Sequence, residues 1–320
     1  MAFLSSSVTP FKSLVAVVPV YQPDPIRLRQ ALELLAIDCR HLFVVDNGGL
    51  ASALEGWNKR PAGLEILGNG VNLGVAAAQN LGIRRAFEVG ADAVLFLDQD
   101  SLPRPGMVRV LAEACVELQS EGHLVAACGP RYHEPGGKAL SGFVRLGCLG
   151  LRLVNPPRHD SVVECAFLIS SGMLVPLEAL KKSGFMEEDL FIDHVDTEWC
   201  FRAAAHGFSC FGIGGAVMEH ELGRKRKKIW LGRWRQIPDH PPERYFYLVR
   251  NTLWLVRRDY IPVACKLHLL SRLFGLLSTR VLTTRKASST VLHSFYGVCE
   301  GVIKIKRGVY RPMNLKSKKS

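Results

Sequence analysis

Short apolar runs alternate with helix-like stretches over the first hundred residues, and this alternation constrains the fold more than any other feature. Four runs are typical of buried strands: Leu14–Val20, His41–Val45, Leu64–Leu67 and Val94–Leu97. Two stretches between them have helical patterns: Ile26–Leu35, with Ile26, Leu28, Leu32 and Leu35 on roughly one face, and the Ala-rich Val75–Glu88. Strands joined through helices return in the same direction and form a parallel sheet. The sequence therefore predicts an α/β fold.

The fourth strand ends at two carboxylates, Asp98 and Asp100, in the segment AVLFLDQDS. Ligands of open α/β sheets bind beyond the carboxyl ends of the strands. Two carboxylates there suit a hard divalent cation that keeps positions open for phosphate oxygens. The alternative is an Asp-rich turn in which Ser101 and residues 103–106 begin a helix. Both interpretations are open from this segment alone.

A glycine-rich turn, Gly68–Gly74, precedes the Ala-rich helix. Its backbone is suited to close approach by a nucleotide, and the following helix end offers N–H groups to phosphate. The turn matches neither the Walker nor the Rossmann fingerprint, and a plain loop before a helix explains it equally well.

The middle of the chain has weaker patterns. We expect a helix over Pro105–Gln119 and a strand over Leu124–Cys128, followed by a Gly- and Pro-rich region, residues 129–157, that we interpret as a substrate-shaping excursion. The apolar run Phe167–Val175 has the small centre Ser170-Ser171-Gly172. It indicates either a bulged strand or a pocket wall that another group approaches closely.

Three carboxylates, Asp193, Asp196 and Glu198, lie within six positions. Such crowding is costly unless the charges cap a helix, pair with a cation such as Arg202, or serve catalysis. Asp196 stands where a helix is expected to begin, so helix capping is its simplest local explanation.

Five segments taken in order carry a resemblance to a known family: strand-DQDS near residue 100, FLISSG from Phe167, LFIDHVDTEWCFR from Leu190, MEHELG around His220, and RYFYLVRN from Arg244. Together they resemble the inverting family 2 glycosyltransferases with the GT-A fold. The likeness is greatest to bacterial rhamnosyltransferases that extend rhamnolipids or build O-antigen and core oligosaccharide. It spans roughly residues 14–251 and implies a mixed, mainly parallel central sheet.

The resemblance implies roles for individual residues. Asp98 and Asp100 form the DxD element that holds a divalent metal, Mg²⁺ or Mn²⁺, with His220 as a third ligand. Asp196 is the catalytic base. The family often has an acidic residue before the base, whereas this chain has Val195, which leaves Asp193 and Glu198 as weaker candidates. The nucleotide pocket of the family corresponds to Pro19, Tyr21, Asp46, Asn47, Asn72, Gly74 and Asp98.

The implied chemistry is transfer of a sugar, with dTDP-L-rhamnose as the favoured donor, to a hydroxyl of a glycolipid or of a lipopolysaccharide or O-antigen-type acceptor, a rhamnolipid included. A carboxylate that removes the acceptor's proton accelerates such a step by about 10²–10⁴-fold. The metal and cations within residues 224–228 would neutralise the leaving diphosphate.

Charge divides the chain unevenly. Residues 1–220 hold 18 Lys and Arg against 24 Asp and Glu, whereas residues 221–320 hold 23 against 5. The basic end therefore meets an anionic partner. The aromatic-interleaved basic patches of RNA-binding motifs are absent, so we expect no nucleic acid. We predict an extension over residues 1–13, a GT-A domain over 14–240, and a helical, basic, membrane-associating region over 241–320.

Ile261–Leu282 is mostly apolar but contains Lys266, His268, Arg272 and Arg280. A membrane-spanning helix would bury those charges at about 2.5–3.5 kcal/mol each near the bilayer centre. An amphipathic helix on an anionic membrane surface fits better, with residues 304–307 and the KSKKS tail adding attraction. The alternative is a helix packed on the catalytic domain.

The nine cysteines are scattered without a CxxC pair, and no secretory signal is evident. We expect reduced core thiols and a cytoplasmic protein that is peripheral on the inner membrane. Two other functions remain: a phosphatase with Asp98 as nucleophile, whose downstream lysine and acidic loop have no clear counterpart, and a non-catalytic basic membrane-associated binding protein.

Overall fold

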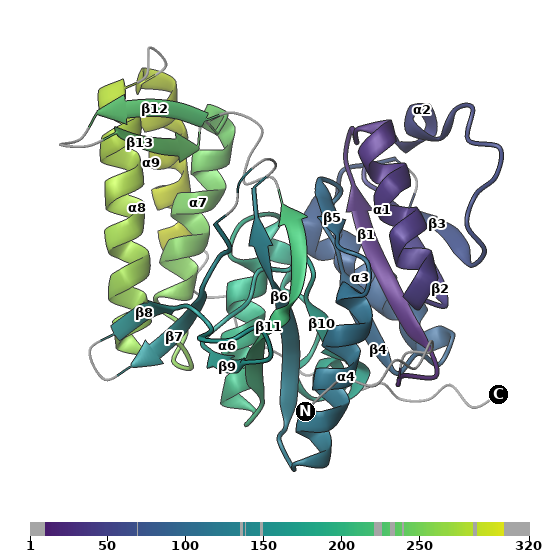
Figure 1. The fold of residues 1–320 in the computed structure, drawn as a ribbon. Helices are drawn as coiled ribbons and strands as arrows, with labels where there is room; N and C mark the ends of the chain where they lie inside the picture. The colour runs from purple at the N-terminus through teal and green to yellow at the C-terminus, as the bar shows by residue number, and fades with distance from the viewer. Residues whose placement is uncertain are drawn as a thin grey trace, which may run out of the picture.

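A computed structural model describes residues 10–68, 70–134, 137, 139–147, 150–220, 226–230, 234–238, 240–283 and 287–303. The predictions for residues 1–9, Arg224 and residues 304–320 lie outside this part of the chain. Figure 1 shows the central sheet with three long helices standing side by side along one flank.

Four parallel strands confirm the predicted alternation: β1 (Leu14–Val20), β2 (His41–Asp46), β3 (Leu64–Gly68) and β4 (Ala93–Phe96), in the order β3-β2-β1-β4. The sheet continues through β10 (Leu174–Pro176), β6 (Val125–His133), β11 (Ser209–His220) and β5 (Ser101–Pro103), and β9 (Val162–Cys165) also pairs with β11. β10 runs antiparallel to β4 and β6, and β5 runs antiparallel to β11. The sheet is therefore mixed and mainly parallel in its first half.

Helices cover both faces of this sheet. α1 (Pro25–Asp38) and α4 (Met107–Ser120) contribute to one core, and α3 (Gly74–Glu88) and α6 (Val195–Ala205) contribute to the other. Alternate residues of β1 point into opposite cores, Val17 with Ile83 on one side and Val18 with Leu32 on the other. Because both faces are buried, the strand is apolar at every position. Ile26, expected on the buried face of α1, is instead exposed.

The sequence left the run Phe167–Val175 open between a bulged strand and a pocket wall; in the structure only its last two residues, Leu174 and Val175, belong to a strand, β10. Ser170 to Met173 turn across the end of β4, where Gly172 N–H donates to Phe96 O at 2.7 Å. Gly172 has φ of +78°, and a Cβ there would lie 2.5 Å from Pro130 Cγ. This close approach requires glycine and breaks the strand.

The region without a clear pattern contains a hairpin of β7 (Phe143–Gly147) and β8 (Gly150–Val154). Short helices complete this part: α2 (Leu50–Leu54), α5 (Leu177–Ser183) and the 3₁₀ helix η1 (Glu188–Leu190). Seven of the eight cysteines that the structure describes are buried and free, as expected; Cys299 is half-buried.

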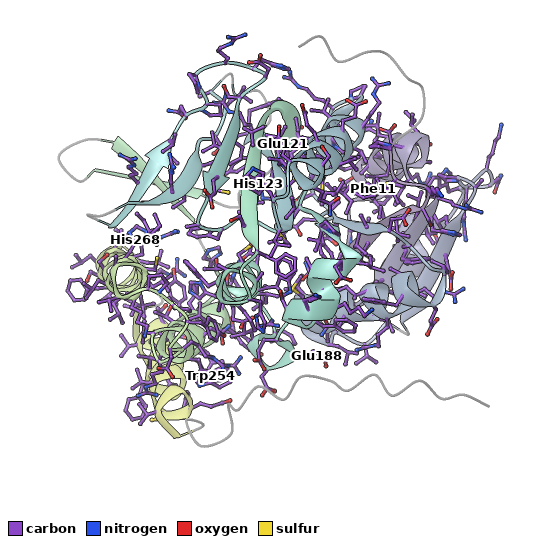
Figure 2. The ribbon with its side chains drawn as sticks, turned by 90° about the horizontal axis from the view of Figure 1, so that it is seen from below. Phe11, Glu121, His123, Glu188, Trp254 and His268 are labelled. Atoms are coloured by element: carbon purple, nitrogen blue, oxygen red, sulfur yellow. The ribbon has the colours of Figure 1, made fainter. Side chains whose placement is uncertain are left out.

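The basic end forms α7 (Pro242–Leu255), α8 (Val263–Thr283) and α9 (Ala287–Ile303), preceded by a ribbon of β12 (Arg226–Trp230) and β13 (Trp234–Pro238). Figure 2 shows these helices beside the sheet, with Trp254 and His268 labelled. Leu255, Cys265 and Leu269 pack into the core that contains α3 and α6. Among the helices described, none is long and apolar enough to cross a membrane.

Candidate active site

Strand pairing brings His220 to the two carboxylates that follow β4. β5 and β11 run antiparallel with His220 opposite Ser101, so this histidine lies beside Asp100 although 120 positions separate them in the sequence. One ligand atom from each of Asp98, Asp100 and His220 lies within 4.8 Å of the others. The structure therefore brings all three predicted metal ligands close together.

The donor set fits a divalent cation. Asp100 Oδ1 is buried and accepts no hydrogen bond from any described residue. It lies 3.7 Å from His220 Nδ1. A buried carboxylate oxygen without a donor is unfavourable in a metal-free fold, whereas a cation beside two carboxylates and an imidazole would satisfy it.

Asp98 is held in an environment that opposes its charge. Burial, with the nearby charges of Asp100 and Asp196, raises the pKa of Asp98 to about 7, against hydrogen bonding from Ser170 and the charge of Arg244. A bound cation would reverse this balance, since an opposite charge favours the ionised carboxylate.

Two serines that the sequence did not identify as site residues contact the predicted metal ligands. Ser171 Oγ accepts the Asp98 N–H at 3.2 Å and lies 2.6 Å from Ser101 Oγ, which lies 2.7 Å from His220 Nδ1. Groups that form hydrogen bonds with metal-ligating residues fix the orientation of those residues. For Ser171, the sequence signal was the small centre of the 167–175 run, which was open between a bulged strand and a pocket wall and predicted no contact with Asp98 or His220.

Asp196 lies in the first turn of α6, but it is not the N-cap. The N-cap is His194, and its side chain makes no capping bond. Asp196 Oδ2 accepts the Ser170 N–H at 3.0 Å, and Oδ1 accepts the Thr197 N–H at 2.7 Å. Burial raises the pKa of Asp196, while these hydrogen bonds lower it. Ser170 thus contacts Asp98 through its hydroxyl and Asp196 through its backbone.

The other two crowded carboxylates are paired. Asp193 accepts from Arg244, with the closest contact 2.7 Å. Glu198 is fully buried, pairs with Arg202 at 2.8 Å and accepts the Tyr260 hydroxyl at 2.5 Å. No Lys or Arg in the part of the chain that the structure describes forms an ion pair with Asp196. Asp196 is therefore the carboxylate of the three best placed to accept a proton.

The loop before α6 is strained and held in place by α7. Phe191, Asp193 and His194 have φ of 62°, 63° and 65°, which non-glycine residues rarely adopt. Asn251 Nδ2 donates to the carbonyl oxygens of Leu190, Ile192 and Asp193 at 2.9, 2.7 and 3.1 Å. The segment RYFYLVRN, through Asn251, therefore holds this loop in place by hydrogen bonds.

The predicted nucleotide-binding residues gather at the carboxyl ends of β1, β2 and β3. Gln99 Oε1 accepts the Tyr21 N–H at 2.7 Å, and Gln99 Nε2 donates to Tyr21 O at 2.9 Å. These two hydrogen bonds join the DQD turn to the end of β1. Asp46 Oδ1 accepts the Gly48 N–H at 2.8 Å. Pro19 lies next to this end of β1, opposite Val45.

The glycine-rich turn is tied down by two asparagines. Asn47 Nδ2 donates to Gly74 O at 3.1 Å, and Asn72 Oδ1 accepts the Gly74 N–H at 3.0 Å. The sequence left open whether N–H groups at this helix start face a phosphate; the N–H of Val75 donates to Phe191 O at 2.7 Å. The start of α3 is therefore joined to the strained loop before Asp196.

Comparisons with known proteins agree with this architecture. Residues 15–145 match the model of glycosyl transferase family 2. The chain is 31% identical over 279 residues to the dTDP-rhamnosyl transferase RfbF of Shigella flexneri, covering 86% of this chain and 90% of that protein. It is 26% identical over 217 residues to the galactofuranosyltransferase GlfT1 of Mycolicibacterium smegmatis, covering 64% and 70%.

Two groups of solved structures share the fold. Residues 1–349 of S. aureus TarS, in complex with UDP-GlcNAc, align with a TM-score of 0.55 at 13% identity, covering 88% of this chain and 79% of that chain. GalNAc-T7 with UDP, GalNAc and Mn²⁺ aligns with a TM-score of 0.53 at 11% identity, covering 83% and 55%. These matches confirm the GT-A fold.

The extent of the match to RfbF decides between the three functions left open by the sequence. The similarity continues beyond the DQD segment through most of the chain, as a shared enzyme family requires. The phosphatase and the non-catalytic binding protein are therefore set aside. The chain is a glycosyltransferase and belongs to glycosyl transferase family 2.

Proposed function

We propose that the protein transfers L-rhamnose from dTDP-L-rhamnose to a hydroxyl of a glycolipid or of a lipopolysaccharide or O-antigen-type acceptor, with inversion at the anomeric carbon. The observation that carries the proposal is the bridge through Ser170 between the acidic cluster and Asp196, a buried carboxylate that forms no ion pair with any Lys or Arg among the described residues. The choice of donor rests on similarity to the dTDP-rhamnosyl transferase RfbF.

Asp98, Asp100 and His220 would hold Mg²⁺ or Mn²⁺ on the donor diphosphate. When bound, the cation neutralises the charge that develops on the departing diphosphate. Tyr21, Asp46 and Asn47 would border the nucleotide, because they lie where the parallel strands end beside Gln99.

Asp196 would act as the general base. It accepts the proton of the acceptor hydroxyl while that oxygen attacks the anomeric carbon. The bond from this carbon to the diphosphate oxygen breaks, and its electron pair leaves with the nucleoside diphosphate. Burial suits this role, since it raises the pKa of Asp196 and so makes the carboxylate a stronger base.

The enzyme would work as a peripheral protein on the cytoplasmic face of the inner membrane, where lipid-linked acceptors are available. Residues 221–320 hold 23 basic and only 5 acidic residues, and this positive charge supports the location. We propose residues 14–240 as the catalytic domain and 241–320 as the membrane-associating region, with α7 contributing supports to the active-site loop.

Nucleotide release from a panel of donors tests the reaction. dTDP-L-rhamnose should be turned over faster than UDP-galactose, UDP-GlcNAc or dTDP-glucose in the presence of Mg²⁺ or Mn²⁺. NMR of the glycoside formed should show the anomeric configuration opposite to that of the donor. Preference for another donor would overturn the assignment of rhamnose, and retention of configuration would overturn the role of Asp196.

A further inference from the structure

The outer face of α8 is an exposed apolar stripe. Val263, Leu267, Leu270 and Phe274 are spaced by four, three and four positions, so they lie on one side of the helix. All four are exposed, and Phe274 retains 75% of its accessible surface. The opposite side of α8 packs Cys265 and Leu269 into the core. The helix therefore has two apolar sides, of which one has a partner in the described structure.

The neighbouring helix repeats this arrangement. α9 contacts α8 and stands beside it in Figure 1. Its Val291, Leu292, Phe295 and Val302 are exposed, with Phe295 at 59%. Its Gly297 and Gly301 face α7, where Phe246 and Leu253 approach them. Two adjacent helices thus each turn one side inward and expose apolar side chains on another, which is uncommon for a surface without a binding partner.

Charge identifies the occupant of this surface. α8 has no acidic residue, and the single acidic residue of α9, Glu300, pairs with Arg250 at 3.4 Å. The surrounding region, residues 221–320, carries an excess of 18 basic residues. A second copy of the chain would bring the same positive charge to the contact, whereas an anionic lipid surface attracts basic side chains and accepts apolar ones.

We propose that the α8–α9 face, defined here as Val263, Leu267, Leu270, Phe274, Val291, Leu292, Phe295 and Val302, inserts into the interface of an anionic bilayer. The inference deepens the proposed function by assigning its membrane location to one surface. The same helices contact α7, which supports the loop before Asp196. Lipid binding would therefore place the active site close to a membrane-held acceptor.

Vesicle sedimentation tests the face directly. Wild-type protein should sediment with phosphatidylglycerol–phosphatidylethanolamine vesicles and much less with phosphatidylcholine vesicles. The double variant Leu267→Ser/Phe274→Ser should weaken this binding at least about tenfold, because each side chain loses apolar burial in lipid. Phe295→Ser on α9 should weaken it in the same direction.

The matched control is Ile37→Ser/Leu124→Ser. These residues are 71% and 57% exposed, comparable to Leu267 at 63% and Phe274 at 75%, but they lie on α1 and beside β6. The control should bind vesicles as the wild type does. Circular dichroism and release of dTDP from dTDP-L-rhamnose, measured without lipid, should be unchanged in all these variants.

The outcomes separate this inference from the proposed reaction. Equal binding of wild type and α8–α9 variants to anionic vesicles would show that the α8–α9 face does not insert, while the proposed membrane location would stand. No binding by the wild type would overturn both, without bearing on donor turnover. A dimer in gel filtration that these variants dissociate, with no vesicle binding, would show that a second copy occupies the face.

Discussion

The guanidinium of Arg244 contacts both carboxylate oxygens of Asp193, with Nη2 2.7 Å from Oδ1 and Nε 3.0 Å from Oδ2. This paired arrangement joins α7 to the loop that precedes Asp196. It also engages the charge of Asp193, which the sequence left as a fall-back base. α7 is thus part of the structure that positions the loop before Asp196.

Asn251→Leu is expected to destabilise the fold and lower kcat. The variant replaces the amide that donates to three loop carbonyls with an apolar side chain branched at the same carbon. Each buried acceptor left without a donor costs about 1–3 kcal/mol. Urea unfolding and kcat should both show the loss, and Glu243→Gln, at an exposed position of the same helix, should show neither. Equal stability of the two variants would contradict the support by Asn251.

Asp196→Asn is expected to lower kcat by at least about 10²-fold with nearly unchanged donor affinity. Asparagine retains an oxygen that can accept the Ser170 N–H but cannot take the acceptor's proton. Turnover with both substrates saturating, with donor affinity from calorimetry, separates the two effects. Turnover within a few-fold of wild type would exclude Asp196 as the base.

Asp100→Asn is expected to abolish tight Mn²⁺ binding and metal-dependent donor binding. The change removes the charge of a carboxylate whose Oδ1 lacks a hydrogen-bond donor among the described residues. Calorimetric titration with MnCl₂ measures the metal alone, and dTDP binding is measured with and without chelator. Asp160→Asn, a change on an acidic residue paired with Arg158 at the surface, serves as the control. Wild-type activity in excess chelator would contradict a metal site.

The metal-free protein should lose stability as pH rises from about 4 to about 7. The pKa of Asp98 is raised from its ordinary 3.8 to about 7 in the fold, so the folded state holds this proton more tightly than the unfolded chain. Stability is then greatest below the unfolded pKa and falls as pH rises through the folded one. The raised pKa of Asp196 acts in the same direction.

Thermal unfolding in EDTA between pH 5 and 8 measures this dependence. Asp98→Asn should flatten it, because the amide has no charge to bury, and should raise the melting temperature most at pH 8. Identical pH profiles for variant and wild type would show that burial of Asp98 is not the cause.

Gly74→Ala should destabilise the protein more than Gly90→Ala. Both glycines have positive φ, +85° and +68°, so the backbone strain of the two substitutions is comparable. A Cβ at Gly74 would lie 2.5 Å from Phe191 Cδ2, whereas nothing lies within 4 Å of a Cβ at Gly90. The difference in unfolding free energy therefore reports the contact between α3 and the strained loop. Equal costs would show that the contact contributes nothing.

Much of this protein follows from local sequence. Continuous apolar runs predict β1, β2 and β4 because strands buried on both faces need apolar residues at every position, and the Ala-rich stretch predicts α3. The pair Asp98 and Asp100 is visible because both follow one strand. These features depend on residues that are close in sequence, so the pattern of apolar and polar residues along the chain predicts them.

Tertiary structure decided the rest. His220 meets Asp100 only because β11 pairs with β5, and Asn251 supports Ile192 only because α7 folds back over the loop. Asp193 is ion-paired because Arg244 of that same helix reaches it, whereas Asp196 forms no ion pair with a described Lys or Arg. No local pattern encodes contacts between residues so far apart, since burial and pairing depend on how whole elements pack. Family resemblance could point to these residues, but only the fold shows what they touch.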